Sequence, residues 1–443
     1  MIPKIQLRKT VFPLFQHTHR LSPIANFVPK TDKVRIRPRR QYEQYQHRCV
    51  TSSSTGETPN SAAATTDWNL MYPSPSAIDV TPLAESLRSK VREFTKNKKH
   101  LKLIGILANE GSHRLDSEIY SDRIQQTFEE DGIDYEVWKY PETGEAGEDL
   151  DKRHCLVSGK EIQQARLQWI KDKIKIINSS SDIDGALVFY PIHPFGPKGP
   201  YKCKLTGVYY KTQDDHIRDL IHPSKDVEGL CGTKWFQIRD SGQKYPPSIY
   251  PCTALSVLRI LEEYHIRRGS RKTRGNNKFH KGTDKNGTND SSDKEFEQNK
   301  CWRDQTISIV NRSEIMGRPL AVMLAEKGAT VYSIDIESIL QFRPNGKRLR
   351  RCNPSKTTLE TCLEESTVVV AGVPDYDFRL PLSSIQQGST IVSVSEFPNV
   401  YEEAMFEERP DINYIPQVGK VTVATLSLNL MHLKQKSLSK DLK

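Results

Sequence analysis

The sequence predicts an α/β protein with two domains, and three observations support this prediction. Short apolar runs of strand length alternate with segments of helical periodicity, which is typical of βαβ units with a largely parallel sheet. The alternation occurs twice, on either side of a low-complexity segment at residues 267–300. A chain of 443 residues is too long for one ordinary core, and 36% hydrophobic residues supply enough apolar material for two.

The first α/β unit begins near residue 78. Its predicted strands cover residues 101–108, 134–138 and 185–190, and its predicted helices cover residues 116–130, 158–178 and 254–265. Gly132 ends the first helix, Ser158 opens a capping box with Glu161, and Thr253 is the expected N-cap of the third helix. Residues 195–215 are expected to form a surface insertion.

The second unit follows the low-complexity segment. Its predicted strands cover residues 305–310, 329–334, 367–371 and 390–394. The first strand leads through a tight turn at 311–317 into a helix with Pro319 in its first turn and Gly328 at its end. A strand, a glycine turn, a helix and a second strand ending in Asp335 together outline a nucleotide-binding unit.

The turn carries the first chemical signal. Only Gly317 matches a glycine of the dinucleotide fingerprint, but the backbone N–H groups at the helix start can bind a pyrophosphate. Ser313 adds a hydroxyl, and Arg312 or Arg318 adds a positive charge. Asp335 follows Gly317 by 18 residues, near the spacing of the acid that binds an adenosine ribose, and a carboxylate there favours NAD over NADP. The alternative is that Asp335 caps the next helix.

Five segments resemble the methylenetetrahydrofolate dehydrogenase/cyclohydrolase family and occur in the family's order. They are Lys-Asp-Val-Glu-Gly-Leu at 225–230, Tyr-Pro-Cys-Thr at 250–253, Asn-Arg-Ser-Glu-Ile-Met-Gly-Arg-Pro at 311–319, Ala-Thr-Val-Tyr-Ser-Ile-Asp at 329–335 and Gly-Lys-Val-Thr-Val-Ala at 419–424. The resemblance covers roughly residues 78–435 and is strongest to the monofunctional, NAD-dependent fungal branch.

This resemblance implies two α/β domains with a central cleft and a homodimer. The folate-binding catalytic domain would comprise residues 76–250 and a C-terminal helix at 420–436, and a Rossmann-type NAD-binding domain would comprise residues 251–419. The resemblance also implies a role in one-carbon metabolism and purine biosynthesis. The expected substrate is 5,10-methylenetetrahydrofolate, in its polyglutamylated form.

The resemblance also assigns site residues. Tyr120 and Cys252 would be catalytic, and Asp226, Glu228 and Pro251 would bind the substrate. The residues implied at the cofactor are Asn311, Arg312, Ser313, Gly317, Arg318, Asp335, Ile336, Val373 and Pro374, with no metal. A carboxylate such as Glu228 can accept two hydrogen bonds from an aminopyrimidine edge. Two alternatives stay open, since Tyr120 shares a core stripe with residues 124 and 128 and Cys252 is also explained as a buried residue at a helix start.

Two departures from the family pattern bear on the reaction. Bifunctional members have a Lys where this chain has Ile124, and a Gln where it has Phe189. Cyclohydrolase chemistry needs an activated water and moving protons, which neither side chain can supply. Hydride removal from the N–CH₂–N bridge needs no such group. We therefore expect NAD-dependent oxidation to the 5,10-methenyl form without cyclohydrolase activity; the alternative is a bifunctional enzyme that activates water through His193 or Asp226.

Charge is concentrated in two segments. Residues 1–50 hold 11 basic and 2 acidic residues, and residues 267–300 hold 10 and 5, so 44 basic and 48 acidic residues remain elsewhere despite the net charge of +10. The basic residues at 1–75 resemble a mitochondrial transit segment, with a simple disordered extension as the alternative. The expected location is the mitochondrial matrix if the extension is a presequence, and the cytoplasm if translation starts at Met71.

Other classes of protein fit less well. A nucleic-acid-binding protein would be expected to show an aromatic-interleaved basic strand or a helix-turn-helix outline, and the sequence has neither. A folate-binding pseudoenzyme conflicts with the intact dinucleotide outline. The apolar runs are shorter than the roughly 20 residues of a membrane span. The eight cysteines form no CxxC pair, which argues against structural zinc or a disulfide framework.

Overall fold

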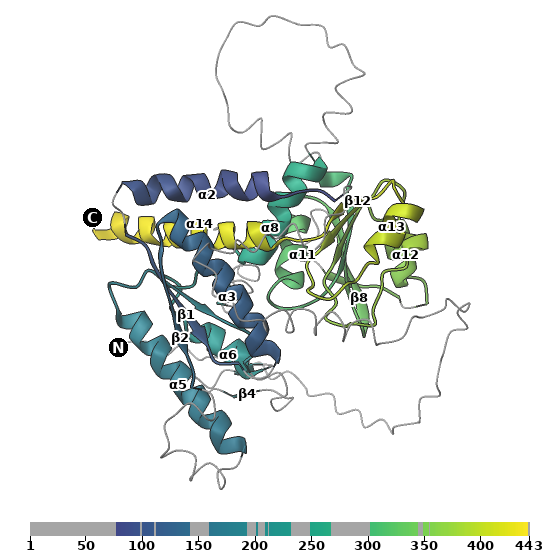
Figure 1. Cartoon of the computed structure of the whole chain (residues 1–443). Helices are drawn as coiled ribbons and strands as arrows, with labels where there is room; N and C mark the ends of the chain where they lie inside the picture. The colour runs from purple at the N-terminus through teal and green to yellow at the C-terminus, as the bar shows by residue number, and fades with distance from the viewer. Residues whose placement is uncertain are drawn as a thin grey trace, which may run out of the picture. The chain divides into compact units, whose positions relative to one another are not determined.

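The computed structural model describes most of the chain from residue 77 onward (Figure 1). The described ranges are 77–97, 100–109, 112–141, 159–192, 201–202, 209–210, 212–231, 249–266, 302–343, 349–353 and 355–441. The predicted extension at 1–75 and the predicted loop at 267–300 lie outside these ranges. Residues 69–443 form one compact unit, and the domain boundaries at 250 and 419 stay predictions.

The first sheet has three parallel strands, with β1 (Lys102–Leu107) between β2 (Asp134–Lys139) and β3 (Gly185–Val188). Because alternate residues of a strand point to opposite faces, β1 supplies both cores. Leu103 and Leu107 join the cluster around α3 (Ser112–Asp131), whereas Ile104 and Ile106 join the cluster around α5 (Gly159–Ser179). The three strands and these two helices confirm the predicted elements of this unit.

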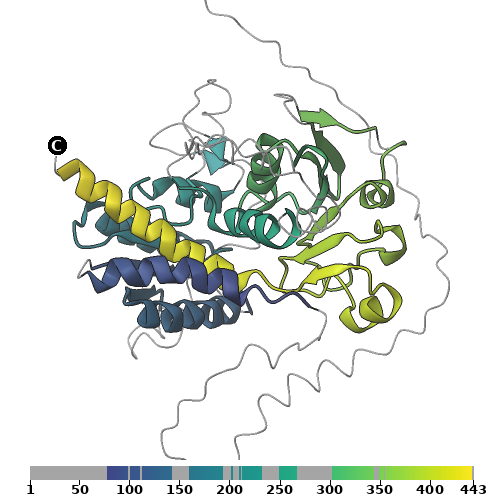
Figure 2. The ribbon, with the colours of Figure 1, turned by 90° about the horizontal axis from the view of Figure 1, so that it is seen from above.

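A long C-terminal helix completes this part of the molecule. α14 (Gly419–Asp441) packs along α2 (Thr81–Lys96) and against α8 (Cys252–Leu261), and Figure 2 shows α14 and α2 side by side. Leu430 of α14 reaches the first strand position of β3, where a Cβ on Gly185 would lie 2.8 Å from its side chain. Helix α14 thus packs against the three-stranded sheet. The predicted helix at 420–436 is confirmed.

The second sheet has seven strands in the order β12-β11-β10-β6-β7-β8-β9. The predicted strands correspond to β6 (Thr306–Val310), β7 (Thr330–Asp335), β10 (Val368–Ala371) and β11 (Thr390–Ser393). These four and β12 (Asn413–Ile415) are parallel, whereas β8 (Ser338–Phe342) and β9 (Leu349–Arg351) continue the sheet antiparallel. The expected largely parallel sheet is therefore confirmed.

Several elements were not predicted from the sequence. They are the strands β8, β9 and β12 above, helix α2, the hairpin β4 (Tyr201–Lys202) and β5 (Tyr209–Tyr210), α6 (Gln213–Leu220), the π-helix η2 (Glu262–Ile266), α12 (Leu359–Glu364), the 3-10 turn η3 (Leu382–Ser384) and α13 (Glu402–Glu408). No helix in the described ranges is long and apolar enough to cross a membrane.

One sequence-based expectation and one alternative are wrong. Thr253 is not an N-cap, because α8 already begins at Cys252 with Pro251 at the cap position and no side-chain capping bond. The proline ring fixes φ at that position but offers no acceptor to the N–H groups of the first turn. Asp335 does not cap a helix either, since β7 leads into the antiparallel strand β8.

The turn between β6 and α11 (Gly317–Glu326) depends on one glycine. A Cβ on Gly317 would lie 2.1 Å from the carbonyl oxygen of Asn311 and 2.7 Å from its Oδ1. The helix start therefore packs directly on the end of the strand, which is the close approach that nucleotide-binding turns require.

Replacing Gly317 with Ala should lower the free energy of unfolding by about 1–3 kcal/mol, because the added methyl group displaces the Asn311 backbone. Urea denaturation measures this change. Gly419→Ala is the matched control, since nothing lies within 4 Å of the added Cβ. Equal stability of the two variants would contradict the proposed role of Gly317.

Candidate functional site

A buried carboxylate organises the loop that follows the first sheet. Asp226 is 6% exposed, and its Oδ1 and Oδ2 accept hydrogen bonds from the backbone N–H groups of Gly229 (2.9 Å) and Cys231 (2.8 Å). Its backbone also pairs with Ala186 of β3 as an isolated parallel bridge. The loop thus pairs with β3 and is closed on itself by one side chain.

Glu228 lies within this loop and is held in an unfavourable environment for a charge. Its Oε2 is 3.4 Å from the backbone N of Val188, at the carboxyl end of β3. Burial, followed by the nearby charge of Asp226, raises the pKa of Glu228 to about 8. The side chain is therefore largely protonated at neutral pH, and a ligand with paired N–H donors would stabilise its ionised form.

The segment at 250–252 packs on the same loop. Gly229 has a φ of +69°, and a Cβ there would lie 2.6 Å from the backbone of Tyr250. The N–H of Cys252 donates to the carbonyl of Glu228 at 3.0 Å. Asn429 of α14, which sequence reasoning missed, donates to the carbonyls of Val227 (2.9 Å) and Tyr250 (3.2 Å). Its only sequence signal is an Asn between two leucines of this helix.

Tyr120 of α3 faces this group. Burial, then the neighbouring Cys252 and Glu228, raise the pKa of its hydroxyl, so it stays protonated. Its ring meets the ring of Phe189 edge to face, with centroids 6.2 Å apart. Ile124, one turn further along α3, is fully buried in the core. The structure therefore places the predicted residues Tyr120, Glu228 and Cys252 together, with apolar side chains around them.

Cys252 is the first residue of α8 and is 7% exposed. Burial, then the nearby Glu228, raises the pKa of its thiol to about 12. A thiol that stays protonated at neutral pH is a poor nucleophile. Its geometry fits the packing role that the sequence left open. Pro251 is also buried and sets the start of the same helix.

The Glu228→Gln variant should be more stable than the parent protein at high pH, because the parent loses stability as the pH rises and the variant does not. The unfolded chain releases the Glu proton near its ordinary pKa of 4.5, whereas the folded protein keeps it until about pH 8. The parent protein therefore loses stability across this interval, to a total of about 5 kcal/mol, and the Gln variant does not.

Thermal unfolding of both proteins from pH 5 to pH 9 measures this difference. Glu129→Gln, at an exposed position on α3, is the control. Parallel melting-temperature curves for parent and Glu228→Gln would show that the buried carboxyl does not titrate in this range.

The dinucleotide turn follows β6 at the carboxyl edge of the second sheet. The Oδ1 of Asn311 accepts from the N–H of Ser313 at 2.7 Å, and its Nδ2 donates to the carbonyl of Gly372 at 2.5 Å. The Ser313 hydroxyl oxygen accepts from the N–H groups of Met316 (3.2 Å) and Gly317 (3.4 Å). Its own proton remains able to donate to an anion at the helix start.

Arg312 takes a different position from the one expected. Its guanidinium donates to the hydroxyl of Ser338 at 2.8 Å and to the carbonyls of Ser333 and Ser338 at 2.5 Å each, so it braces β7 against β8. It also lies 3.8 Å from the Oδ2 of Asp335. Asp335 is about half exposed, and the adjacent Ile336 is fully exposed, so both are open to a ligand at this edge.

The other predicted cofactor residues lie on loops around the same edge. Arg318, in the first turn of α11, pairs with Glu314 of the preceding turn at 2.9 Å. Val373 follows β10, and its N–H and C=O bond the side chain of Asn399 at 2.9 and 3.0 Å. Pro374 is exposed beside it. Asn399 was missed from the sequence, where an isolated Asn in a loop carries no distinctive signal.

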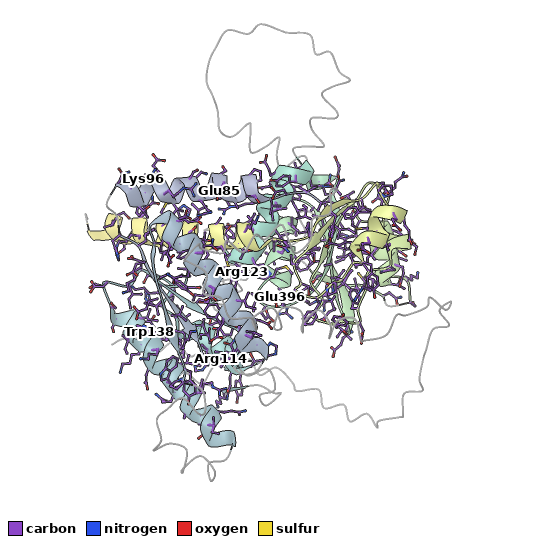
Figure 3. All side chains as sticks on the ribbon, in the orientation of Figure 1. Glu85, Lys96, Arg114, Arg123, Trp138 and Glu396 are labelled. Carbon is purple, nitrogen blue, oxygen red and sulfur yellow. The ribbon has the colours of Figure 1, made fainter. Side chains whose placement is uncertain are left out.

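Charges link α3 to the loop that follows β11. Arg123 and Glu396 interact electrostatically, and Figure 3 shows the two side chains near each other between these elements. Burial, then the nearby Asp116, raises the pKa of Glu396. Since residues 116, 120 and 123 share one face of α3, the Tyr120 face is turned toward the dinucleotide sheet. Among the described residues, no group of three or more His, Cys, Asp or Glu could hold a metal ion.

A largely parallel seven-stranded sheet with a glycine-dependent turn, together with a three-stranded parallel sheet beside a buried carboxyl, defines an α/β protein with a Rossmann-type sheet. The comparisons are more specific. The chain is 28% identical over 371 residues to the NAD-dependent methylenetetrahydrofolate dehydrogenase of Dictyostelium discoideum, covering 82% of this chain and 95% of that protein. It is 29% identical over 347 residues to that of Schizosaccharomyces pombe, covering 76% and 86%.

Solved structures agree in fold. The NAD-dependent 5,10-methylenetetrahydrofolate dehydrogenase of Saccharomyces cerevisiae superposes with a TM-score of 0.58 at 24% identity, over 82% of this chain and 98% of that one. No family model matches the chain. The resemblance to the methylenetetrahydrofolate dehydrogenase/cyclohydrolase family and the predicted fold class are both confirmed.

Proposed function

We propose that this protein is an enzyme that oxidises 5,10-methylenetetrahydrofolate to the 5,10-methenyl form with NAD, and that it lacks cyclohydrolase activity. The observation that carries the proposal is the buried cluster in which Tyr120 lies near Glu228 and against the ring of Phe189, with the buried Ile124 one turn further along α3. These side chains suit recognition of a flat heterocycle but offer little acid–base chemistry. The names of the two relatives above support the reaction and the cofactor.

The reaction itself needs few functional groups. The bond that breaks is a C–H bond of the methylene bridge, and its electron pair leaves with the hydrogen. The lone pairs of the two flanking nitrogens stabilise the cation that remains, so no proton has to be moved. Holding the substrate at a fixed distance from the hydride acceptor is then the protein's main contribution.

The substrate would be held by its ring system. The ionised Glu228 accepts two hydrogen bonds from an aminopyrimidine edge. Because ionising a buried carboxyl is costly, a ligand without these two donors would bind poorly. Tyr120 supplies an aromatic face, braced by Phe189. The backbone contacts of Asp226 keep Glu228 in place during binding.

The second sheet fits a dinucleotide. The turn after β6 allows close backbone approach because residue 317 is glycine, Ser313 keeps a free donor, and Asp335 presents an exposed carboxylate at the end of β7. NAD would supply the hydride acceptor here. Arg312 holds the strand end that carries Asp335, and Ile336 offers an apolar surface beside it.

The bifunctional alternative requires a group that activates water. Asp226 is one candidate, but both of its oxygens already accept backbone hydrogen bonds. The other candidate, His193, lies outside the described residues. Ile124 and Phe189 occupy the positions where bifunctional members carry Lys and Gln, and both are buried in apolar surroundings. The geometry therefore favours the monofunctional reaction.

The purified protein should reduce NAD in the presence of 5,10-methylenetetrahydrofolate and should not accelerate hydrolysis of 5,10-methenyltetrahydrofolate. Absorbance of NADH at steady state measures the first activity, and loss of methenyl absorbance measures the second. Phe189→Gln with Ile124→Lys is a gain-of-function control for the second assay. Robust hydrolysis by the parent protein would contradict the monofunctional proposal.

Replacing Asp335 with Ser should raise the ratio of kcat/KM for NADP to that for NAD by about tenfold or more. The carboxylate of Asp335 repels a 2′-phosphate, and its removal leaves the guanidinium of Arg312, which lies 3.8 Å from that carboxylate, to attract the phosphate. Asp304→Ser removes a carboxylate before the opposite end of β6 and serves as the control. An unchanged ratio in Asp335→Ser would mean that the ribose is recognised elsewhere.

Three further proposals rest on the resemblance. The protein would form a homodimer, which sedimentation or light scattering can test. It would act on polyglutamylated folate in one-carbon metabolism that supplies purine biosynthesis. It would reside in the mitochondrial matrix if residues 1–75 are a presequence and in the cytoplasm if translation begins at Met71, and N-terminal sequencing of the native protein separates these two cases.

A further inference from the structure

A buried hydroxyl near Glu228 has no hydrogen-bond partner. The phenolic oxygen of Tyr190 is one of the few buried side-chain atoms without one in the part of the chain that the structure describes. The Oδ1 of Asn109 is another, and Asn109 is 1% exposed. Leaving a buried polar atom unpaired is costly, so such atoms are rare unless a ligand or water supplies the partner.

Both atoms lie at the same edge of the first sheet. Asn109 follows the carboxyl end of β1, and Tyr190 follows the carboxyl end of β3. The Nδ2 of Asn109 donates to the Ser117 hydroxyl at 2.7 Å and contacts the carbonyl of Phe189 at 3.4 Å, which ties the two strand ends together. In parallel α/β sheets this edge is where ligands bind.

The Tyr190 ring is fixed and its hydroxyl faces acidic groups. The guanidinium of Arg218 stacks over the ring at 4.7 Å from its centroid. Burial raises the pKa of the Tyr190 hydroxyl; the charge of Arg218 opposes this effect, whereas Glu228, Asp214 and Asp226 add to it, so the hydroxyl keeps its proton and can act as a donor. The hydroxyl and the Glu228 carboxyl are close enough to interact electrostatically, but the structure shows no hydrogen bond between them.

We propose that the Tyr190 hydroxyl donates a hydrogen bond to the ring carbonyl of a 2-amino-4-oxo heterocycle whose amino side is bound by Glu228. This inference rests on the proposed function and specifies how the ring is recognised. Along one edge, such a ring presents an exocyclic amine, a ring N–H and a carbonyl, that is, two donors followed by an acceptor. The Glu228 carboxylate supplies two acceptors and Tyr190 supplies the donor, so the protein presents the complementary pattern.

Tyr190→Phe tests the inference because it removes only the unpaired oxygen. Calorimetric titration with tetrahydrofolate, which has the ring but no bridge to oxidise, should show affinity about 3–10-fold weaker than in the parent protein. The melting temperature without ligand should be unchanged or higher, since the variant loses an unsatisfied group. Tyr332→Phe is the control: its hydroxyl is already bonded to Glu365 at 2.5 Å, so it should lose stability and keep its folate affinity.

A second ligand identifies the atom that is recognised. The 2,4-diamino analogue of tetrahydrofolate replaces the ring carbonyl with an amine, and Tyr190→Phe should not weaken its binding. Equal affinity of parent and Tyr190→Phe for tetrahydrofolate, or an equal loss for both ligands, would overturn the inference. A parent protein that binds no tetrahydrofolate would instead contradict the proposed function.

Discussion

Two backbone N–H groups donate to the carboxylate of Asp226, and the shape of the candidate folate pocket follows from that contact. The bonds close the loop at 226–231, turn Gly229 into the left-handed region and bring the carbonyl of Glu228 to the first N–H of α8. Asn429 then fastens the same loop to the C-terminal helix. Asp226, which the family resemblance implies binds the substrate, thus holds the loop that carries Glu228 in the described structure.

Strand periodicity and glycine positions made most of the fold predictable. The buried runs at 103–107 and 368–371 have few polar residues because helices or neighbouring elements cover both faces of each strand, and this pattern is visible in sequence. The strands β8 and β9 were not predictable in the same way. They form the antiparallel end of the second sheet, and the residues of β8 are partly exposed and mixed in character, so the pairing of β8 depends on tertiary contacts such as the Arg312 brace.

The candidate site was predictable only as far as residue type carries chemistry. Asp335 stands out by its spacing from Gly317, whereas Glu228 and Tyr120 are implied by the family resemblance, and the structure brings these two together. Arg312 shows the limit of that reasoning. A guanidinium beside a glycine turn suggests phosphate binding, yet its reach also allows it to hold two serines on adjacent strands, and only the fold decides between these uses.

The two halves of the site differ in how well their polar groups are satisfied before a ligand binds. On the dinucleotide side, Asn311 and Ser313 already bond the backbone around the turn, which is therefore preformed. On the folate side, burial disfavours the ionised form of Glu228, and the Tyr190 hydroxyl has no hydrogen-bond partner. A ligand that pairs with these groups removes the cost of leaving them unsatisfied, so its binding stabilises the folded protein. A ring without the matching edge leaves the same groups unpaired, and specificity follows from that difference.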